Sequence, residues 1–214
     1  MKQYTTIQEV HQLLEKMYND LNSICYNNEL APTLITIMKS RHGKDLGWGS
    51  AEKIWFQKKG NESHEATAYY EINICADALY LPIHEIACIM LHEMAHIYNA
   101  QNDIKDTSRS GTYHNKKFAQ TAERHGLVCK EDPNRKNGHC ITELADESIR
   151  IISNMHYGEI KLIRMNSQKS HGTYKRYVCP GCGSIIRATS SVNVLCIDCN
   201  LVYKYEETRS RKVN

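Results

Sequence analysis

Hydrophobic positions recur at the helical period in four parts of the chain. Over residues 6–25 they return every three or four residues, and Thr6 with Glu9 forms a capping-box sequence at the start. Residues 83–98 show the same period and predict a buried amphipathic helix. Two shorter helices are predicted from residue 114 or 115 to residue 125 and over residues 143–155.

Runs of alternating or β-branched residues predict three strands before the second helix. The strands lie at residues 34–38, 53–57 and 67–74. The segment with Gly43, Gly47 and Gly49 is predicted to be a glycine-rich turn, and polar loops are predicted at residues 101–113 and 129–140. This order of elements predicts the α+β class, with a small sheet packed on helices.

The composition fits one sizeable domain with a small module attached. The chain has 214 residues, of which 41% are hydrophobic and 24% charged, and no apolar run approaches the length of a membrane span. The first residues lack an apolar signal core, so we expect a cytoplasmic protein that does not contact membranes. In that setting the nine cysteines are better explained as metal ligands and reduced thiols than as disulfides.

The charge is distributed unevenly along the chain. Residues 1–159 hold 17 Lys and Arg against 21 Asp and Glu, whereas residues 160–214 hold 10 against 3. A basic C-terminal quarter on a mildly acidic body indicates an appendage that binds polyanions. The alternative is a solvated tail with no binding role.

The sequence Leu-His-Glu-Met-Ala-His-Ile-Tyr fills residues 91–98, in the second predicted helix. His92 and His96 are four residues apart, so their imidazoles lie on one helix face and can share one metal ion. Glu93 is placed beside them to take a proton from a water on that metal. This is the pattern of the zincin hydrolases, in which zinc lowers the pKa of bound water from about 15.7 to about 7. We therefore predict a zincin-like domain with one catalytic Zn²⁺; the alternative is a pair of ordinary histidines.

A catalytic zinc ion usually has three protein ligands and one open position. Asn102 stands where the metzincin pattern requires a histidine, which excludes that subclass. His114, Glu123 and His125 are candidates for the third ligand, and helix geometry allows one zinc ion to use only one of them. We favour His114, at the head of the helix where a loop can steer it, and Glu123 is the alternative.

Two CxxC pairs near the C-terminus are separated by thirteen residues. They consist of Cys179, Cys182, Cys196 and Cys199. Gly181 and Gly183 allow the tight turns of such motifs, and the spacing predicts a zinc ribbon with a second, structural Zn²⁺. About 30 residues cannot build an adequate core alone, so the metal would supply much of the folding free energy. A redox role for one CxxC would not explain two matched pairs.

Cations alternate with tyrosines around these cysteines. The candidate residues for nucleic-acid contact are Tyr174, Lys175, Arg176, Tyr177, Arg187 and Lys204. Cations bind phosphates and aromatic rings stack on bases, which suits single-stranded DNA. The alternative is that the tyrosines pack the small ribbon.

The HExxH helix is preceded by strands and followed by Gly111-Thr112-Tyr113-His114-Asn115-Lys116-Lys117-Phe118. In this respect the chain resembles the SprT-like zinc metalloprotease family, which includes Spartan, over about residues 5–155 and the ribbon. In that family the histidine of such a segment is the third zinc ligand. The resemblance therefore implies His92, His96 and His114 as ligands and Glu93 as general base. It also implies DNA-dependent cleavage of proteins bound or crosslinked to DNA.

We expect a SprT-like metalloprotease domain at residues 1–157, a linker at 158–173, a zinc ribbon at 174–206 and a basic tail at 207–214. The expected function is that of a DNA-stimulated zinc metalloendopeptidase with protein substrates, preferring single-stranded DNA, in the cytoplasm at the nucleoid or, in a eukaryotic host, in the nucleus. The alternatives are a non-catalytic DNA-binding or regulatory protein with the same fold, and a general zinc peptidase without DNA dependence.

Two details of the expected catalytic site concern the substrate. A substrate peptide is expected to pair with the edge of the sheet at the predicted strand 67–74. The candidates for an additional donor to the substrate oxyanion are Tyr98, Tyr113 and His125.

Overall fold

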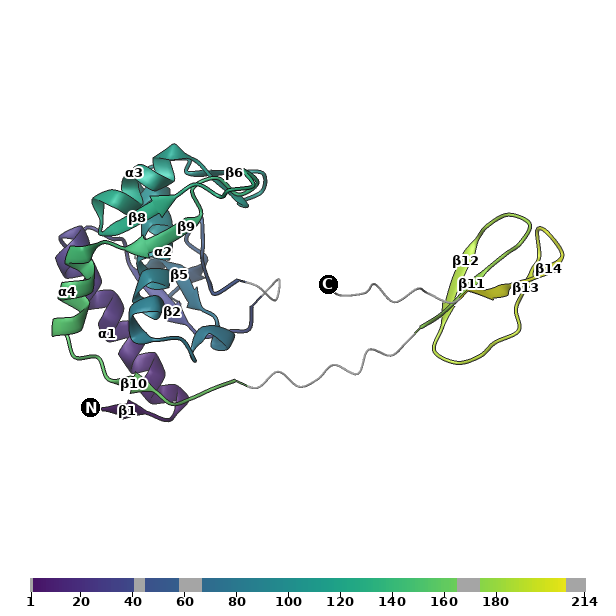
Figure 1. The fold of residues 1–214 in the computed structure, drawn as a ribbon, viewed down its shortest axis with the longest axis horizontal. Helices are drawn as coiled ribbons and strands as arrows, with labels where there is room; N and C mark the ends of the chain where they lie inside the picture. The colour runs from purple at the N-terminus through teal and green to yellow at the C-terminus, as the bar shows by residue number, and fades with distance from the viewer. Residues whose placement is uncertain (1, 41–44, 58–66, 165–173, 207–214) are drawn as a thin grey trace, which may run out of the picture. The chain divides into compact units, whose positions relative to one another are not determined.

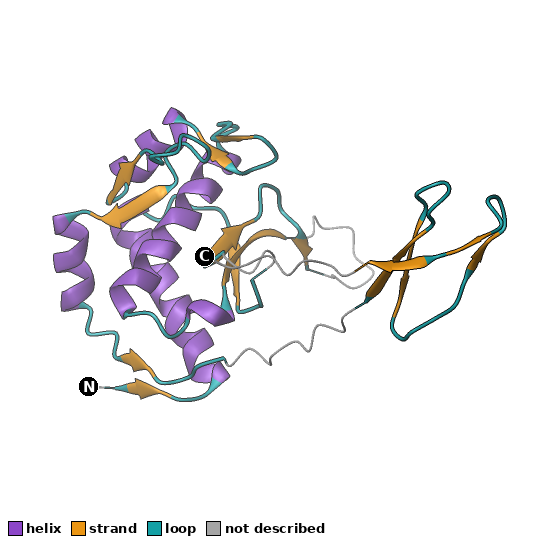
Figure 2. Ribbon diagram, turned by 45° about the vertical axis from the view of Figure 1, so that its right-hand side comes forward, coloured by secondary structure: helices purple, strands orange, loops and turns teal. Residues whose placement is uncertain are grey.

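The computed structural model describes residues 2–40, 45–57, 67–164 and 174–206. The chain divides into two compact units, Met1–Met165 and Asn166–Asn214 (Figure 1). The predicted tail at 207–214 and residues 165–173 of the predicted linker lie outside the described residues. Helices and small sheets together form the first unit, so the predicted α+β class is confirmed (Figure 2).

The helices of the first unit match the hydrophobic periods. The α-helices in its described part are α1 Ile7–Tyr26, α2 Ile83–Gln101, α3 Lys116–Arg124 and α4 Asp146–Asn154, and a 3-10 turn spans Ala76–Ala78. The predicted capping box is present, because the Glu9 N–H donates to Thr6 Oγ1 (3.2 Å) and the Thr6 N–H donates to Glu9 Oε2 (3.1 Å). Asn27 ends α1 in the left-handed conformation, with φ of 51°.

Helix α2 lies at the centre of the first unit, in contact with α1, α3, α4 and the sheet (Figure 1). Its apolar side chains Ile86, Met90, Leu91, Met94 and Ile97 are fully buried. Burial of apolar surface on several sides stabilises the helix by about 1.5–3 kcal/mol for each large side chain. A site built on α2 therefore rests on a helix that is packed on several sides.

The main sheet has the strand order β2-β5-β3, with β2 Thr33–Thr36, β5 Ala68–Ile74 and β3 Gly47–Gly49. Strand β2 is parallel to β5, whereas β3 and β4 Trp55–Phe56 pair with β5 in antiparallel register. The predicted strand 67–74 is therefore the central strand, and the prediction that a peptide pairs with it at the sheet edge is wrong. The predicted turn at Gly47 and Gly49 is instead strand β3, which is an outermost strand of this sheet among the described residues.

Three short strand pairs complete the first unit. They are β1 Gln3–Tyr4 with β10 Glu159–Ile160, β6 Thr107–Ser108 with β7 Tyr113–His114, and β8 Leu127–Lys130 with β9 Ile141–Leu144. The pair β8–β9 encloses most of the predicted loop 129–140, and its second strand delays the start of α4 from residue 143 to Asp146. Glu159 and Ile160, which fall in the predicted linker, pair with β1 and close the unit.

The second unit consists of short antiparallel strands. Its three-stranded sheet has the order β12 Ile185–Ala188, β11 Lys175–Val178 and β15 Lys204–Glu206, and β13 Leu195–Cys196 pairs with β14 Leu201–Val202. None of the helices in the described part of the chain has the length and apolar character needed to cross a bilayer.

Candidate metal centre

Three histidine side chains from two parts of the chain converge in the first unit. His92 and His96 lie one turn apart on α2, and His114 comes from β7, just before the start of α3. Nε2 of His114 is 3.2 Å from Nε2 of His92 and 3.1 Å from Nε2 of His96. Their ligand atoms all lie within 4.8 Å of one another. The structure thus brings the two motif histidines together with the favoured third candidate.

The three nitrogen atoms fit a small divalent cation. Nitrogen ligands of a tetrahedral zinc ion lie about 3.3 Å apart, because each Zn–N bond is about 2.0–2.1 Å. Nδ1 of His96 donates to the Asp106 carboxylate (2.7 Å), so Nε2 of neutral His96 presents a lone pair. Nδ1 of His92 is hydrogen-bonded to Thr142 Oγ1 (3.2 Å), which turns Nε2 of that ring toward the same point. These residues could hold Zn²⁺.

A chain of buried hydrogen bonds fixes the orientation of His96. Asp106 also accepts from Asn99 Nδ2 (3.0 Å), and Asn99 Oδ1 accepts from Thr121 Oγ1 (2.7 Å). Asn99 is fully buried, and Asp106 and Thr121 are nearly so. Partners of this kind hold a metal-ligating histidine in one tautomer and orientation. The sequence motif did not reveal Asp106 or Asn99, because no fixed spacing links them to HExxH.

The environment keeps two of the three imidazoles neutral. Burial lowers the pKa of His92 well below its usual value, and the neighbouring His96 and His114 lower it further. Burial likewise lowers the pKa of His114 to about 4. Burial also opposes charge on His96, but the hydrogen bond to Asp106 and the negative charges of Glu93 and Asp106 together outweigh it and raise that pKa. At neutral pH, His92 and His114 therefore offer uncharged nitrogen atoms to a metal.

The ring of Phe118 forms the floor beneath the three histidines. Its centroid lies 4.6 Å from the centroids of His92, His96 and His114, and the side chain is fully buried. Phe118 lies in the first turn of α3, four residues after His114. An apolar floor at this distance limits how far each imidazole can tilt away from the common point.

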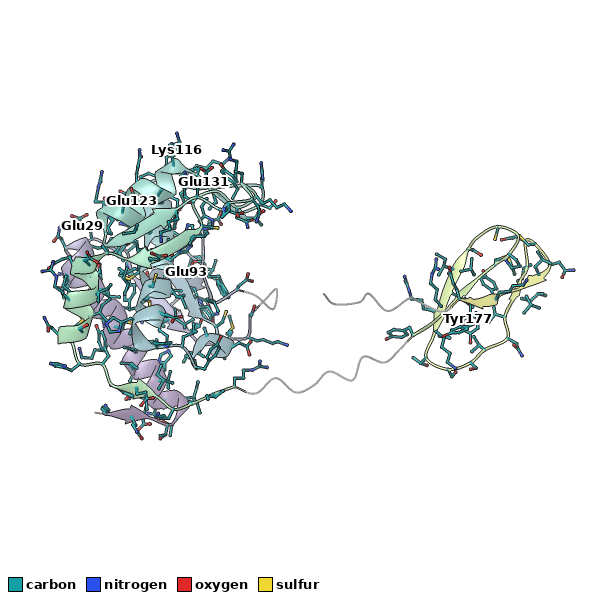
Figure 3. All side chains as sticks on the ribbon, viewed as in Figure 1. Glu29, Glu93, Lys116, Glu123, Glu131 and Tyr177 are labelled. Carbon is teal, nitrogen blue, oxygen red and sulfur yellow. The ribbon has the colours of Figure 1, made fainter. Side chains whose placement is uncertain are left out.

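Glu93 follows His92 directly on α2 and is buried. Figure 3 labels its position in the first unit. Burial raises the pKa of its carboxyl to about 7, although His96 and the Gly49 N–H partly offset this. Strand β3 runs directly over the carboxylate. A Cβ atom on Gly49 would lie 3.4 Å from Glu93 Oε2, and one on Gly47 would lie 2.7 Å from Ile89 Cγ2. Glycine in β3 therefore allows the strand to approach the carboxylate closely.

A structured loop after β8 holds the backbone of His114. The His114 N–H donates to Asn137 O (2.9 Å), and the His139 N–H donates to His114 O (2.9 Å). Gly138 has φ of +67°, and a Cβ there would lie 2.0 Å from His114 O. Asp132 organises the loop by accepting three backbone N–H groups at 2.9–3.2 Å. These contacts steer the third histidine, which lies outside α3.

The other candidates for the third ligand lie elsewhere. Glu123 is exposed on α3 (Figure 3). His125 stacks on Tyr26, with ring centroids 3.9 Å apart, and its Nδ1 donates to Cys25 O (2.6 Å). Tyr98 packs against the same two rings.

The three histidines and Glu93 line one open cleft of about 990 Å³. Tyr98, Tyr113 and His125, the predicted oxyanion donors, are not among the residues that line this cleft, although Tyr113 lies between the lining residues Thr112 and His114. The sequence period could not show this, because it does not indicate which side of a loop or helix end faces the cleft. Polar side chains that do line the cleft include Thr107, Ser110, Thr112, Asn137 and Thr142.

The four cysteines of the second unit also form a compact group. Their Sγ atoms lie within 4.8 Å of one another, and Cys182 Sγ is 3.7 Å from Cys196 Sγ. Sulfur ligands of a tetrahedral zinc ion lie about 3.8 Å apart, because each Zn–S bond is about 2.3 Å. A Cβ on Gly181 would lie 2.8 Å from Cys199 Sγ, so glycine is needed where the two turns meet. This group could hold a second metal ion.

Strand register shows how the nucleic-acid candidates are distributed on the ribbon. Arg176 lies opposite Arg187 on β12 and opposite Glu206 on β15, and Lys204 lies opposite Val178. Residues opposite one another share a sheet face, so Arg176, Arg187 and Lys204 lie on one face. Arg176 forms an ion pair with Glu206, whereas Arg187 and Lys204 are exposed.

The three remaining candidates for nucleic-acid contact, Tyr174, Lys175 and Tyr177, lie in different environments. Tyr177 is buried, packs edge-on against Tyr205, and accepts from the Val192 N–H (3.2 Å). Its ring therefore packs the ribbon, as the alternative interpretation held, and is not available to stack on a base. Tyr174 is 61% exposed, and Lys175 donates to Ser191 Oγ.

Comparison of the chain with protein-family models, with curated proteins and with solved structures gives no match. The chemistry of this protein is therefore inferred from its own residues and their geometry.

We expect purified protein to contain about two zinc ions per chain after dialysis, because each of the two ligand groups suits one ion. His114→Ala removes one of three ligands in the first unit and should lower the content to about one. Glu123→Ala, on the same segment, is the matched control and should retain both. Metal analysis by plasma mass spectrometry measures the difference; loss of zinc in the Glu123 variant alone would reverse the ligand assignment.

Asp106→Asn should weaken metal binding in the first unit about 10–100-fold, because the amide no longer offers a carboxylate to the His96 Nδ1–H. Asp103→Asn changes an exposed carboxylate nearby and should have little effect. Competition with a chromophoric chelator gives both affinities. Equal affinity in the two variants would show that Asp106 does not position His96.

Proposed function

We propose that this protein is a zinc-dependent endopeptidase with a zincin-like fold of the SprT-like type. The observation that carries the proposal is the presence of a buried carboxylate, Glu93, next to three converging imidazoles in an open cleft. A purely structural metal site has no use for such a carboxylate and is normally closed by a fourth ligand. The non-catalytic alternative leaves Glu93 without a role.

Each residue of the cleft has a distinct part in this chemistry. A bound zinc ion would polarise the scissile carbonyl and acidify a water molecule. Glu93, with a pKa raised to about 7 by burial, can take a proton from that water and return it to the leaving amine. Asp106 and Thr142 hold His96 and His92 in orientation, and Phe118 excludes water from below the imidazoles.

Strand β3 offers the substrate a place to bind as an added strand. Cys75 N–H donates to Leu46 O (2.9 Å), and Ser50 N–H donates to Glu71 O (2.8 Å), so residues 46 and 50 face β5. The alternating pattern of an antiparallel pair then directs the backbone groups of Gly47 and Gly49 away from β5, and the Gly49 N–H on that side interacts with the Glu93 carboxylate. Residues 45–51 line the cleft. A peptide paired with this edge would pass over Glu93.

The second unit supports a role on DNA. A four-cysteine ribbon with Arg187 and Lys204 exposed on one face, and with Tyr174 exposed beside it, has groups for phosphates and for one base. We propose that DNA, preferably single-stranded, brings the enzyme to its substrates. Those substrates would be proteins bound or crosslinked to DNA. The rival function is a general zinc peptidase on which DNA has no effect.

Glu93→Gln should retain zinc and lose proteolysis by about 10²–10⁴-fold, because the amide cannot accept the proton. Glu85→Gln is the matched control, since Glu85 lines the same cleft but is exposed. Cleavage of an unfolded protein substrate is followed by gel, with zinc content measured in parallel. Full activity of the Glu93 variant with zinc retained would remove this residue from the mechanism.

Single-stranded DNA should accelerate cleavage of a DNA-binding protein, and the acceleration should fall as salt is raised, because phosphate contacts release counterions. Replacing Arg187 and Lys204 with Ala should reduce the stimulation while leaving the rate without DNA unchanged. Rates with and without an oligonucleotide, at low and high salt, provide the test. A rate independent of DNA at low salt would indicate the general peptidase.

A further inference from the structure

The first unit carries its own concentration of positive charge, on one side of the metal cleft. Residues 105–136 hold eight Lys and Arg against four Asp and Glu, whereas the rest of residues 1–159 holds nine against seventeen. Two of the four carboxylates, Asp106 and Asp132, are buried and occupied by hydrogen bonds. The exposed surface of this segment is therefore more basic than its composition indicates.

Six exposed cations make up what we call the basic wall. They are Lys105, Arg109, Lys116, Lys117, Arg135 and Lys136. None of them forms an ion pair with another described residue, whereas Lys130 nearby is neutralised by Glu143. Unpaired cations held close together repel one another, and a polyanion removes that cost.

Hydrogen bonds bring together the neighbouring segments that carry these cations. Asn115 Nδ2 donates to Lys105 O (2.9 Å), which joins that residue to the start of α3 at Lys116. Arg109 Nη1 donates to Lys136 O (3.1 Å) and so links the β6–β7 turn to the loop after β8. Figure 3 shows Lys116 at the outer surface of the first unit.

The wall borders the catalytic cleft. Residues 106, 107, 110–112, 114 and 137, which alternate with the cations along the same segments, line the cleft. A second groove of about 570 Å³ lies against the wall, lined by Lys105 and Arg109 together with Ser108 and Ser110. Cations and hydroxyl groups are the usual side-chain partners of phosphate oxygens. Two carboxylates, Asp103 and Asp106, also line this groove; Asp103 is exposed and Asp106 is buried.

The chemistry favours nucleic acid over an acidic polypeptide. Asp45, Glu85, Glu93 and Asp106 line the cleft, and no Lys or Arg does so among the described residues. An acidic peptide would be attracted to the wall but repelled from the adjoining cleft, even with one divalent cation bound there. A nucleic acid can bind along the rim without entering. The Arg109 guanidinium also lies 4.9 Å from the centroid of the Tyr113 ring, an arrangement that suits base stacking.

We propose that the basic wall binds the phosphate backbone of nucleic acid beside the metal cleft, as a second contact surface separate from the ribbon. The inference deepens the proposed function, because it locates the DNA next to the site of cleavage. A protein bound to the same DNA would then be presented to the cleft at short range.

The test compares two full-length variants with the same change in charge. In the wall variant, Lys116, Lys117 and Arg135 are replaced by Glu. None of these three side chains forms an ion pair with a residue in the described part of the chain. In the control variant, Lys2, Lys39 and Lys53, which are exposed elsewhere on the first unit, are replaced by Glu. Binding of a fluorescent 20-nucleotide single strand is measured by anisotropy over a range of salt concentrations, with the melting temperature recorded for each protein.

The wall variant should bind roughly tenfold or more weakly at low salt, while the control variant stays within about twofold of the parent. Replacing the same three residues by Gln should reduce the slope of log K against log salt by about 2, since each phosphate contact contributes about 0.7 for single strands. Equal binding by the wall and control variants would overturn the inference, as would the absence of DNA binding by the parent. Equal displacement of the oligonucleotide by polyglutamate of matched charge would also overturn it.

Hydrolysis of a peptide without DNA, run in parallel, separates this inference from the proposed function. Wall-dependent DNA binding in a protein that cleaves nothing would support the wall and contradict the protease. Peptide cleavage by a protein whose DNA binding does not depend on the wall would support the protease and contradict the wall.

Discussion

The convergence of three imidazole nitrogens constrains the surrounding structure, because Nε2 of His114 lies 3.2 Å from Nε2 of His92 and 3.1 Å from Nε2 of His96. Lone pairs facing one another at this distance are unfavourable unless a cation lies between them, so the surrounding structure must hold the rings in place. It does so with hydrogen bonds between His96 Nδ1 and Asp106 and between His92 Nδ1 and Thr142, and with the Phe118 ring beneath. Because Asp106 and Phe118 are buried, we expect their geometry to change little when solvent or substrate enters the cleft.

Helical spacing explains the positions of two of the three histidines, and a loop explains the position of the third. His92 and His96 share a face of α2 because they are four residues apart, whereas the backbone of His114 is held at its N–H and C=O by the loop around Gly138. A side chain would not fit at Gly138, where a Cβ would lie 2.0 Å from His114 O. The geometry of the candidate metal site therefore depends on the close contact between the backbones of His114 and Gly138, which are 24 residues apart in the sequence. Asp132 makes that approach possible by ordering the loop.

The sequence was sufficient where a local pattern repeats. The hydrophobic period located α1 and α2, the capping box located the first residue of α1, and the cysteine spacing located the ribbon knuckles. The sequence was insufficient where contacts between distant parts of the chain determine the structure. Gly47 and Gly49 indicated a turn because glycine is disfavoured in strands, yet β3 needs glycine to lie over Ile89 and Glu93. Asp106, Thr142 and the order of strands around β5 depend on contacts that no spacing in a single sequence records.

The division of charge around the cleft gives the proposed chemistry a physical basis for selectivity. Acidic side chains line the cleft itself, and the exposed cations lie along the rim on the side of His114. Proteins that bind nucleic acid are generally basic, so the surface that we propose contacts DNA and the cleft that we propose receives the polypeptide would attract partners of opposite charge. The two attractions act on one substrate only when protein and nucleic acid are already associated. A free protein or a free polynucleotide would interact with only one of the two surfaces. Neither would bind as tightly as a complex of protein and nucleic acid.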